Sequence, residues 1–152
     1  MQDYSLKCYK CGAIQKNKSV SNIYCEKCKS LLICINISDV KSDPLRSLQT
    51  SKDIGLFTLG EGNTPLIRMD NIANRLGLKN LYAKLEYISP TGSFKDRGSS
   101  LVINIAKKEK LKKFVEDSSG NAGASLSAYA AACGIEAHIF VPDSTGKGKL
   151  DQ

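Results

Sequence analysis

The sequence predicts an α/β fold that follows a small cysteine-rich unit, and three observations support this prediction. From Ile54 onward, strand-like segments alternate with helix-like segments, as in a parallel sheet with helical crossovers. Two C-x2-C pairs lie ahead of this region, within the first 37 residues. Two short polar loops each lead into a helix-like segment, and ligands of such sheets gather beyond the carboxyl ends of strands.

The composition is that of an ordinary globular protein. The 152 residues are enough for one domain or two small ones, with 41% hydrophobic and 24% charged residues. No run of about 18 apolar residues is present, and the first residues lack the basic and apolar stretches of a secretory signal. We therefore expect a cytoplasmic protein without a membrane partner.

The net charge is +7, from 22 basic and 15 acidic residues, and the excess is spread along the whole chain. The densest basic run, residues 107–113, lies at the end of a predicted helix, where cations interact favourably with the helix dipole. No aromatic residues interleave with this run, as they do where proteins stack nucleic-acid bases. A nucleic-acid partner is therefore not expected.

The two C-x2-C pairs are separated by 13 residues. Each pair can form a tight turn that directs two thiolates at one metal ion, and two such turns complete a tetrahedral zinc site. Together with the strand-like run at 31–37, the pattern predicts a zinc ribbon over residues 1–37, with a structural metal and no open coordination position. The predicted ligands are Cys8, Cys11, Cys25 and Cys28.

Two disulfides or a redox pair are the alternatives for these cysteines. A cytosolic location disfavours disulfides, and no thioredoxin-like βαβ pattern surrounds either pair. Cys34 and Cys133 fall outside the pattern and are interpreted as small buried residues. A unit this small has almost no hydrophobic core, so we expect it to need its metal to fold.

The rest of the chain is interpreted as a linker or arm at residues 38–53, followed by an α/β domain at residues 54–152. In that domain, a helix near Asp70–Leu76 ends at Gly77, a residue type that readily ends helices. The further elements are a strand near Leu81–Glu86, a helix after Ser93, a strand at Lys113–Asp117, a helix from Ala122 to Cys133 and a strand at Ile135–Val141. His138 alternates with apolar residues in the last strand and is given a structural role.

The first polar loop reads P-T-G-S-F-K-D-R-G, from Pro90 to Gly98. Ser93 can cap the following helix, which places Lys95 in the first helical turn. A helix N-terminus carries partial positive charge, so this field, with partial burial, favours a free amine that can form a Schiff base with an aldehyde. The face of this helix predicted to be buried consists of Phe94, Gly98, Leu101, Val102, Ile105 and Ala106.

The second polar loop reads S-S-G-N-A-G and covers residues 118–123, between a strand and a helix rich in small residues. Backbone N–H groups at such a helix start can bind an anion, and Asn121 adds a hydrogen-bonding side chain. The small residues allow close approach to a sheet or a cofactor. Together the two loops predict a site for an aldehyde and a carboxylate.

Three motifs carry a family resemblance: S-F-K-D-R-G around Lys95, S-S-G-N-A-G around Asn121, and G-E-G-N-T-P-L at residues 60–66. Over about residues 55–152, the chain resembles the threonine synthase branch of the fold-type II pyridoxal-phosphate enzymes. The resemblance implies that Lys95 holds pyridoxal phosphate covalently and, once released, acts as acid and base on substrate carbons. Asn121 would hydrogen-bond the ring hydroxyl of the cofactor.

The resemblance also implies a small amino-acid substrate. Its carboxylate would be bound by the loop residues Ser118, Ser119, Gly120, Asn121 and Ala122. The implied reaction converts O-phosphohomoserine and water into threonine and phosphate, in an enzyme that can be a homo-oligomer at full length. Residues 60–66 are interpreted as a turn that supports the site, and Asp96 and Arg97 as structural residues, with Arg97 pairing with Asp96 or with a phosphate.

Two features leave alternatives open. Ala122 lacks the hydroxyl that often follows the loop asparagine in threonine synthases, so a related dehydratase or synthase is possible. The zinc ribbon favours threonine synthase, although it is also similar to the ribbon of a related cysteate-forming enzyme. An alternative of another class is a zinc-ribbon binding module attached to a degenerate enzyme remnant, but a remnant would be expected to have lost Lys95 or Asn121.

Members of this family carry, well downstream, a Gly-rich loop for the cofactor phosphate and a residue that faces the pyridine nitrogen. Neither is found in this sequence, where Gly146–Lys149 is too short to serve as the phosphate loop. We therefore expect that residues 54–152 are the N-terminal part of the catalytic domain, that the chain is truncated, and that it is inactive by itself.

Overall fold

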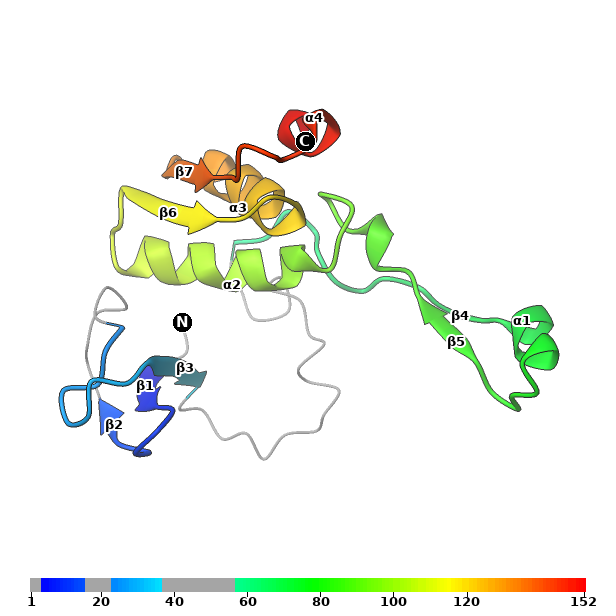
Figure 1. The fold of residues 1–152 in the computed structure, drawn as a ribbon, viewed down its shortest axis with the longest axis horizontal. Coiled ribbons are helices and arrows are strands. Elements are labelled where there is room, and N and C mark those ends of the chain that lie inside the picture. Colours follow the sequence, from blue (N-terminus) through cyan, green and yellow to red (C-terminus); the bar gives the residue numbers. More distant parts are fainter. Residues whose placement is uncertain (1–3, 16–22, 37–56) are drawn as a thin grey trace. The chain divides into compact units, whose positions relative to one another are not determined.

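The computed structural model describes residues 4–15, 23–36 and 57–152, and the chain divides into two compact units, Met1–Ser47 and Leu48–Gln152 (Figure 1). The predicted linker at 38–53 lies outside the described residues. No helix in the described ranges is long and apolar enough to cross a membrane.

The N-terminal unit contains a three-stranded antiparallel sheet with strand order β2-β1-β3. Its strands are β1 (Tyr4–Cys8), β2 (Ile14–Gln15) and β3 (Leu32–Asn36). Along β1, Leu6 and Cys8 are buried whereas Lys7 between them is exposed, as the two-residue period of a strand requires. The side chain of Cys34 lies outside the described residues, so its predicted burial stays a prediction.

Nine elements lie in the described part of the second unit, residues 57–152. In chain order they are β4 (Leu66–Arg68), α1 (Asp70–Arg75), β5 (Tyr82–Lys84), the 3-10 helix η3 (Glu86–Ile88), α2 (Lys95–Lys108), β6 (Lys113–Asp117), α3 (Asn121–Ala132), β7 (Glu136–Phe140) and α4 (Lys147–Asp151). Gly77, with φ of 67°, follows α1 and confirms the predicted helix end.

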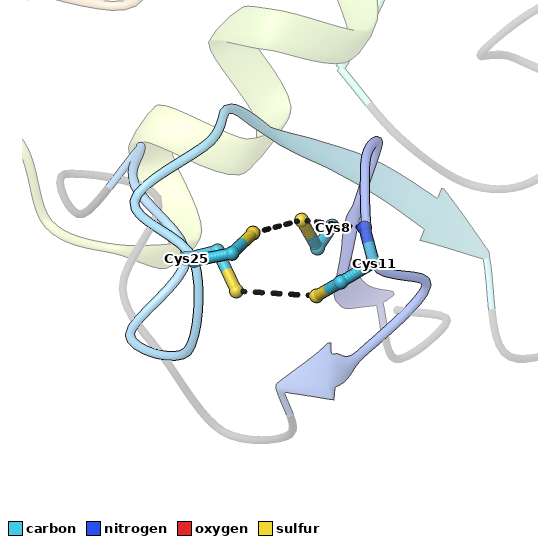
Figure 2. A group of neighbouring side chains, drawn as sticks. Cys8, Cys11 and Cys25 are labelled. Carbon is cyan, nitrogen blue, oxygen red and sulfur yellow. Dashed lines mark hydrogen bonds between the residues drawn. The ribbon is translucent and has the colours of Figure 1, made fainter.

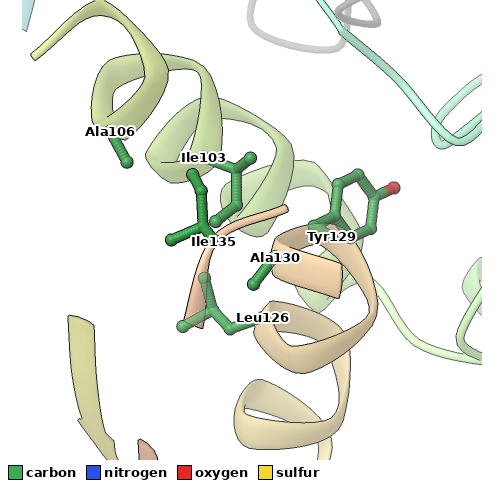
Figure 3. Close-up of a cluster of buried hydrophobic side chains, with 6 residues drawn as sticks. All are labelled: Ile103, Ala106, Leu126, Tyr129, Ala130 and Ile135. Atoms are coloured by element: carbon green, nitrogen blue, oxygen red, sulfur yellow. The ribbon is translucent and has the colours of Figure 1, made fainter. Parts of the chain in front are cut away.

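The strands β6 and β7 pair in parallel, from Lys113 opposite Glu136 to Asp117 opposite Phe140, and α3 is the crossover between them. This confirms the parallel α/β pattern for the second half of the unit. Helix α3 packs against both α2 and β7. Figure 3 shows the resulting core, which consists of Ile103, Ala106, Leu126, Tyr129, Ala130 and Ile135.

The predicted strand at Leu81–Glu86 does not join this parallel sheet. Its central part, β5, pairs antiparallel with β4 in a separate two-stranded sheet (Figure 1). All three residues of β4 are exposed, which suits an antiparallel pair facing water and not a parallel strand buried on both faces. The alternation of elements along the sequence therefore predicted one strand too many for the parallel sheet.

The predicted buried face of α2 is also wrong in most positions. Phe94, Leu101 and Val102 are each about half exposed, and Ala106 is the member of the predicted set that is buried. The buried side chains of the helix are Asp96, Ser99, Ser100, Ile103, Asn104 and Ala106. Most of these are polar, and they are buried because partners elsewhere in the unit satisfy their hydrogen bonds. A pattern based on apolar residues cannot detect such a face.

Candidate active site and metal centre

The turn before α2 fixes where Lys95 lies. Gly92 donates its N–H to the carbonyl of Ser89 at 2.8 Å and has φ of 78°, a conformation that favours glycine. Ser93 is buried, and its Oγ accepts a 3.3 Å hydrogen bond from the N–H of Lys95. Helix α2 begins at Lys95, which therefore lies in the first turn as predicted, but the residue at the N-cap position is Phe94 and not Ser93.

The side chain of Lys95 is exposed, which corrects the expected partial burial. Its Nζ atom lies 4.6 Å from the centroid of the Phe94 ring, and that ring is itself 57% exposed. The Phe94 ring beside the Lys95 amine is therefore also open to solvent. The amine is accessible to an aldehyde that approaches the start of α2.

Asp96, next in the chain, is completely buried. Its Oδ2 accepts a 2.8 Å hydrogen bond from the N–H of Thr91, and its Oδ1 accepts from the Thr91 hydroxyl. Its Oδ1 also accepts a 2.6 Å hydrogen bond from the hydroxyl of Ser125 on α3. One carboxylate therefore links the turn before Lys95 to the neighbouring helix.

The second loop follows the carboxyl end of β6, as predicted. The N–H of Ser118 donates to the carbonyl of Phe140 at 3.1 Å, and the Ser118 Oγ accepts from the N–H groups of Gly120 and Gly123 at 3.4 and 3.0 Å. Two of the donors expected to face an anion are thus satisfied inside the loop. The N–H groups of Ser119, Asn121 and Ala122 have no hydrogen-bond partner among the described residues, as expected at a helix N-terminus.

Gly123 allows α3 to approach the sheet closely. A Cβ atom at this position would lie 2.8 Å from the Cγ2 atom of Ile139 on β7 and 3.2 Å from the carbonyl oxygen of Ser118. The prediction that small residues of this helix allow close approach to a sheet is therefore confirmed at Gly123.

Packing between α2 and α3 brings the two helix starts into one region. Ser125 contacts Asp96, the residue after Lys95, and Asn121 lies one turn before Ser125 on the same face of α3. We expected a shared edge of one sheet to bring them together, but the Lys95 turn follows β5, which belongs to the other sheet. The helix pair, not the sheet, sets this arrangement.

Glu61, in the G-E-G-N-T-P-L stretch, connects this loop to α3. Its Oε2 accepts hydrogen bonds from the Thr58 hydroxyl at 2.7 Å, the Leu59 N–H at 3.1 Å and the Tyr129 hydroxyl at 2.6 Å. Burial by itself raises the pKa of Glu61, but hydrogen bonds from Ser100, Tyr129 and Thr58 outweigh it and hold the pKa at about 2. The buried carboxylate therefore remains ionised at neutral pH and anchors the loop to α3.

Arg97 forms a salt bridge with Glu86, a partner that the sequence did not suggest. Its Nε and Nη2 atoms donate to the two carboxylate oxygens of Glu86 at 2.9 and 2.8 Å, and Nη2 also contacts the Thr64 hydroxyl at 3.3 Å. The hydrogen bond from Arg97 lowers the pKa of Glu86 to about 2, against the opposing effect of burial. This bidentate salt bridge connects α2 to η3, and the contact with Thr64 connects α2 to the turn before β4.

The cysteine cluster of the N-terminal unit is built from two equivalent turns. In each turn, the residue after the second cysteine has positive φ and donates its N–H to the carbonyl of the first cysteine. Gly12, with φ of 71°, does so to Cys8 at 3.1 Å, and Lys29, with φ of 58°, does so to Cys25 at 2.8 Å. The two C-x2-C motifs therefore fold alike, as expected for paired metal-binding turns.

All four sulfur atoms lie within 4.8 Å of one another. The Sγ atoms of Cys8 and Cys28 are 3.4 Å apart and those of Cys11 and Cys25 are 3.8 Å apart, as Figure 2 shows in part. These separations exceed the ~2.05 Å of a disulfide bond. They are close to the ~3.8 Å edge of a tetrahedron with Zn–S bonds of ~2.3 Å.

Backbone groups of the second turn favour thiolates. The N–H of Cys28 lowers the pKa of the Cys25 thiol, and the N–H of Ser30 lowers the pKa of Cys28 to about 6. Because metal ions bind thiolates and not thiols, this donor arrangement and the sulfur spacing both fit a zinc ion.

Comparison with known proteins identifies the family. Residues 57–152 match the family described as "Pyridoxal-phosphate dependent enzyme", and the chain belongs to this family. It is 37% identical over 164 residues to a threonine synthase of Methanosarcina acetivorans, covering 98% of this chain and 40% of the relative. It is 32% identical over 163 residues to a threonine synthase of Methanocaldococcus jannaschii, covering 96% and 40%.

Solved structures agree with this assignment. The serine racemase of Dictyostelium discoideum is similar with a TM-score of 0.52 and 35% sequence identity, over 58% of this chain and 29% of the racemase. The resemblance inferred from the three motifs is thus confirmed. The chain spans about 40% of the length of the two archaeal threonine synthases that it matches.

Proposed function

We propose that this chain provides the lysine-bearing part of a threonine synthase, which converts O-phosphohomoserine and water into threonine and phosphate. The observation that carries the proposal is the contact between α2 and α3. There, the buried hydrogen bond from Ser125 to Asp96 joins the helix that begins with the exposed Lys95 to the helix that begins with Asn121. The identity of the archaeal relatives supports this choice of reaction.

The residues present fit pyridoxal phosphate. When bound, this cofactor withdraws electrons from the substrate carbon next to its nitrogen. Lys95 would hold it and afterwards move protons at the substrate carbons, because its amine is exposed at a rigid helix start. The side chain of Asn121 would hydrogen-bond the ring hydroxyl.

The loop at 118–122 would bind the substrate carboxylate. The N–H groups of Ser119, Asn121 and Ala122 have no partner among the described residues, and an anion at this helix start would satisfy them. Ser118 Oγ already accepts hydrogen bonds from the N–H groups of Gly120 and Gly123, so Ser118 can offer its hydroxyl proton to a carboxylate, whereas the N–H of Gly120 is already used inside the loop.

We also propose a structural zinc ion on Cys8, Cys11, Cys25 and Cys28. The sulfur spacing and the paired turns support it. The two archaeal relatives match 98% and 96% of this chain, which includes the cysteine unit, and both are named threonine synthases. This favours a ribbon that belongs to the enzyme over a separate binding module. Ala122 is the observation that keeps a related dehydratase or cysteate synthase as the second candidate.

Cofactor binding is tested first on residues 1–152. With added pyridoxal phosphate, we expect a visible absorbance band that borohydride reduces irreversibly, and we expect Lys95→Ala to abolish it. Lys107→Ala is the matched control, because Lys107 lies on the same helix with its Nζ 5.0 Å from the Phe57 ring centroid. A band of equal strength in Lys95→Ala would contradict the assignment.

The reaction is tested on the product of the gene as it is expressed, because residues 1–152 span about 40% of the length of the relatives that they match. We expect phosphate release from O-phosphohomoserine with equimolar threonine, and no turnover by residues 1–152 alone. Deamination of serine or threonine without phosphate release would favour the dehydratase. The cytoplasmic location, the amino-acid substrate and a homo-oligomeric full-length form belong to the same proposal.

A further inference from the structure

We propose that Asp96 and Ser125 are positioning residues of the cofactor site, and that their buried hydrogen bond sets where Lys95 stands relative to Asn121. The inference rests on the proposed function, since it assumes that Lys95 holds the cofactor. It assigns a role to two residues that the sequence interpretation left as structural or did not consider.

Lys95 and Asp96, the first two residues of α2, differ in burial. Asp96 is completely buried, whereas the preceding Lys95 is exposed. Both of its carboxylate oxygens are used: Oδ2 by the Thr91 N–H, and Oδ1 by the hydroxyls of Thr91 and Ser125. Since Thr91 belongs to the turn that delivers Lys95, the carboxylate holds the backbone on the N-terminal side of the lysine as well as its own helix.

Ser125 carries this constraint to the second helix. It is completely buried, its hydroxyl lies 2.6 Å from Asp96 Oδ1, and a 2.7 Å hydrogen bond joins it to the hydroxyl of Ser99. Residues four apart lie above one another on a helix, so Ser125 fixes the face of α3 that carries Asn121. The contact therefore restrains the rotation and the sliding of one helix start against the other.

A packing role alone does not account for a carboxylate at this position. A buried charge costs several kcal/mol unless it is fully hydrogen-bonded, and an apolar side chain of similar volume would hold two helices together at lower cost. What the three-fold hydrogen-bonded carboxyl group adds is direction, because each hydrogen bond is favourable over a narrow range of angles. A covalently held cofactor requires a fixed orientation of its lysine relative to the asparagine that contacts its ring.

Ser125→Ala is the decisive variant because it removes one hydroxyl and adds no bulk. We expect its affinity for pyridoxal phosphate to fall roughly tenfold to hundredfold, as for the loss of a hydrogen bond to a charged group. The absorbance maximum of the borohydride-sensitive band is expected to shift, because the ring would lie differently against Asn121. Ser125→Thr keeps the hydroxyl and is expected to restore both the affinity and the maximum.

Ser127→Ala is the matched control, since Ser127 lies on the same helix, is partly buried and makes no side-chain hydrogen bond among the described residues. Asp96→Asn is a second test that keeps the shape and removes the charge. In the cofactor-free chain, hydrogen exchange at residues 118–123 is expected to rise in Ser125→Ala and to stay unchanged in Ser127→Ala. This readout is independent of any bound cofactor, and unchanged exchange in the rest of α2 and α3 would show that the variant is folded.

The outcomes separate this inference from the proposed function. If wild-type protein gives the Lys95-dependent band and Ser125→Ala matches Ser127→Ala in affinity and absorbance maximum, the positioning role is overturned while the proposed function stands. If wild-type protein gives no Lys95-dependent band, both are overturned. Should Asp96→Asn fail to fold, the Ser125→Ala and Ser125→Thr pair still decides.

Discussion

The two units of this chain are held together in opposite ways. In the described part of the N-terminal unit, the buried apolar side chains are Leu6, Cys8 and Cys25, and two of these three belong to the sulfur cluster. The α/β unit instead buries an apolar core between α2, α3 and β7, and lines the helix interface with serine, asparagine and carboxylate groups. The described residues of the first unit bury few apolar side chains besides the clustered cysteines, whereas hydrogen bonds between buried polar side chains join the helices of the second unit.

This difference indicates how each unit should fail. If the proposed zinc ion organises the N-terminal unit, removal of the ion should unfold that unit in one step, because both turns contribute to one site. A unit with distributed hydrogen bonds should weaken in steps, by about 1–3 kcal/mol for each buried partner that is removed. Loss of a metal ligand should therefore have the largest effect, and loss of a single hydroxyl in the α/β unit the smallest.

Replacing one cluster cysteine should have the largest effect. We expect Cys25→Ser to abolish stoichiometric zinc binding and to unfold the N-terminal unit, since structural zinc is worth about 10–16 kcal/mol in small zinc-dependent folds. The far-UV helical signal, which comes mainly from α2 and α3, should persist. Metal content by atomic emission and circular dichroism measure these two outcomes on the same sample.

Cys133→Ser serves as the control, because Cys133 lies in the α/β unit beside the apolar core and outside the sulfur cluster. It should keep one zinc per chain. Zinc retained by Cys25→Ser at wild-type affinity would exclude four-cysteine coordination.

Acid should destabilise the α/β unit through two hydrogen-bonded carboxylates, one buried and one partly exposed. Glu61 and Glu86 both have a folded-state pKa of about 2, against an ordinary value of 4.5. Their stabilisation is complete above pH ~4.5 and is lost as the pH falls towards ~2, and for Glu61 it amounts to about 3 kcal/mol. Urea unfolding followed by helical circular dichroism between pH 5 and 2 should show this decline.

Glu61→Gln tests the assignment, since a neutral amide cannot titrate. Its unfolding free energy should be lower at pH 7 and should vary less with pH than that of the wild type. If the two pH profiles have the same slope, Glu61 does not contribute to the acid dependence.

The smallest of these effects should come from a single hydroxyl. Tyr129→Phe removes the 2.6 Å hydrogen bond to Glu61 and keeps the ring in the core, so we expect a loss of about 2 kcal/mol in the free energy of unfolding. Urea denaturation at pH 7 measures it. Tyr82→Phe, at an exposed position of β5, should differ from the wild type by less than about 0.5 kcal/mol.

Much of the architecture could be predicted from local patterns. The strand at Lys113–Asp117 and the helix that begins at the Asn121 loop lie where the sequence placed them, because period-two and small-residue patterns and turn residues are local signals. The paired cysteine turns were predictable for the same reason. The pairing of β5 with β4 was not, since strand partners are set by contacts distant in sequence.

The polar interior was the part that the sequence could not indicate. Asp96, Ser125 and the pair formed by Glu61 and Tyr129 are ordinary surface residue types, and their burial depends on partners 29 and 68 positions away. The weak sequence signal for Glu61 was its place between two glycines, both of which have positive φ in the structure. Lys95 is exposed together with Gly98, Leu101 and Val102, which lie on the same side of α2.

The lack of space at Gly123 has a consequence for how this site can vary among descendants of the same gene. Any side chain there must displace Ile139 or the Ser118 carbonyl, and α3 would move outward together with the free N–H groups at its start. A residue without a functional group thus restricts where the loop at the start of α3 can lie.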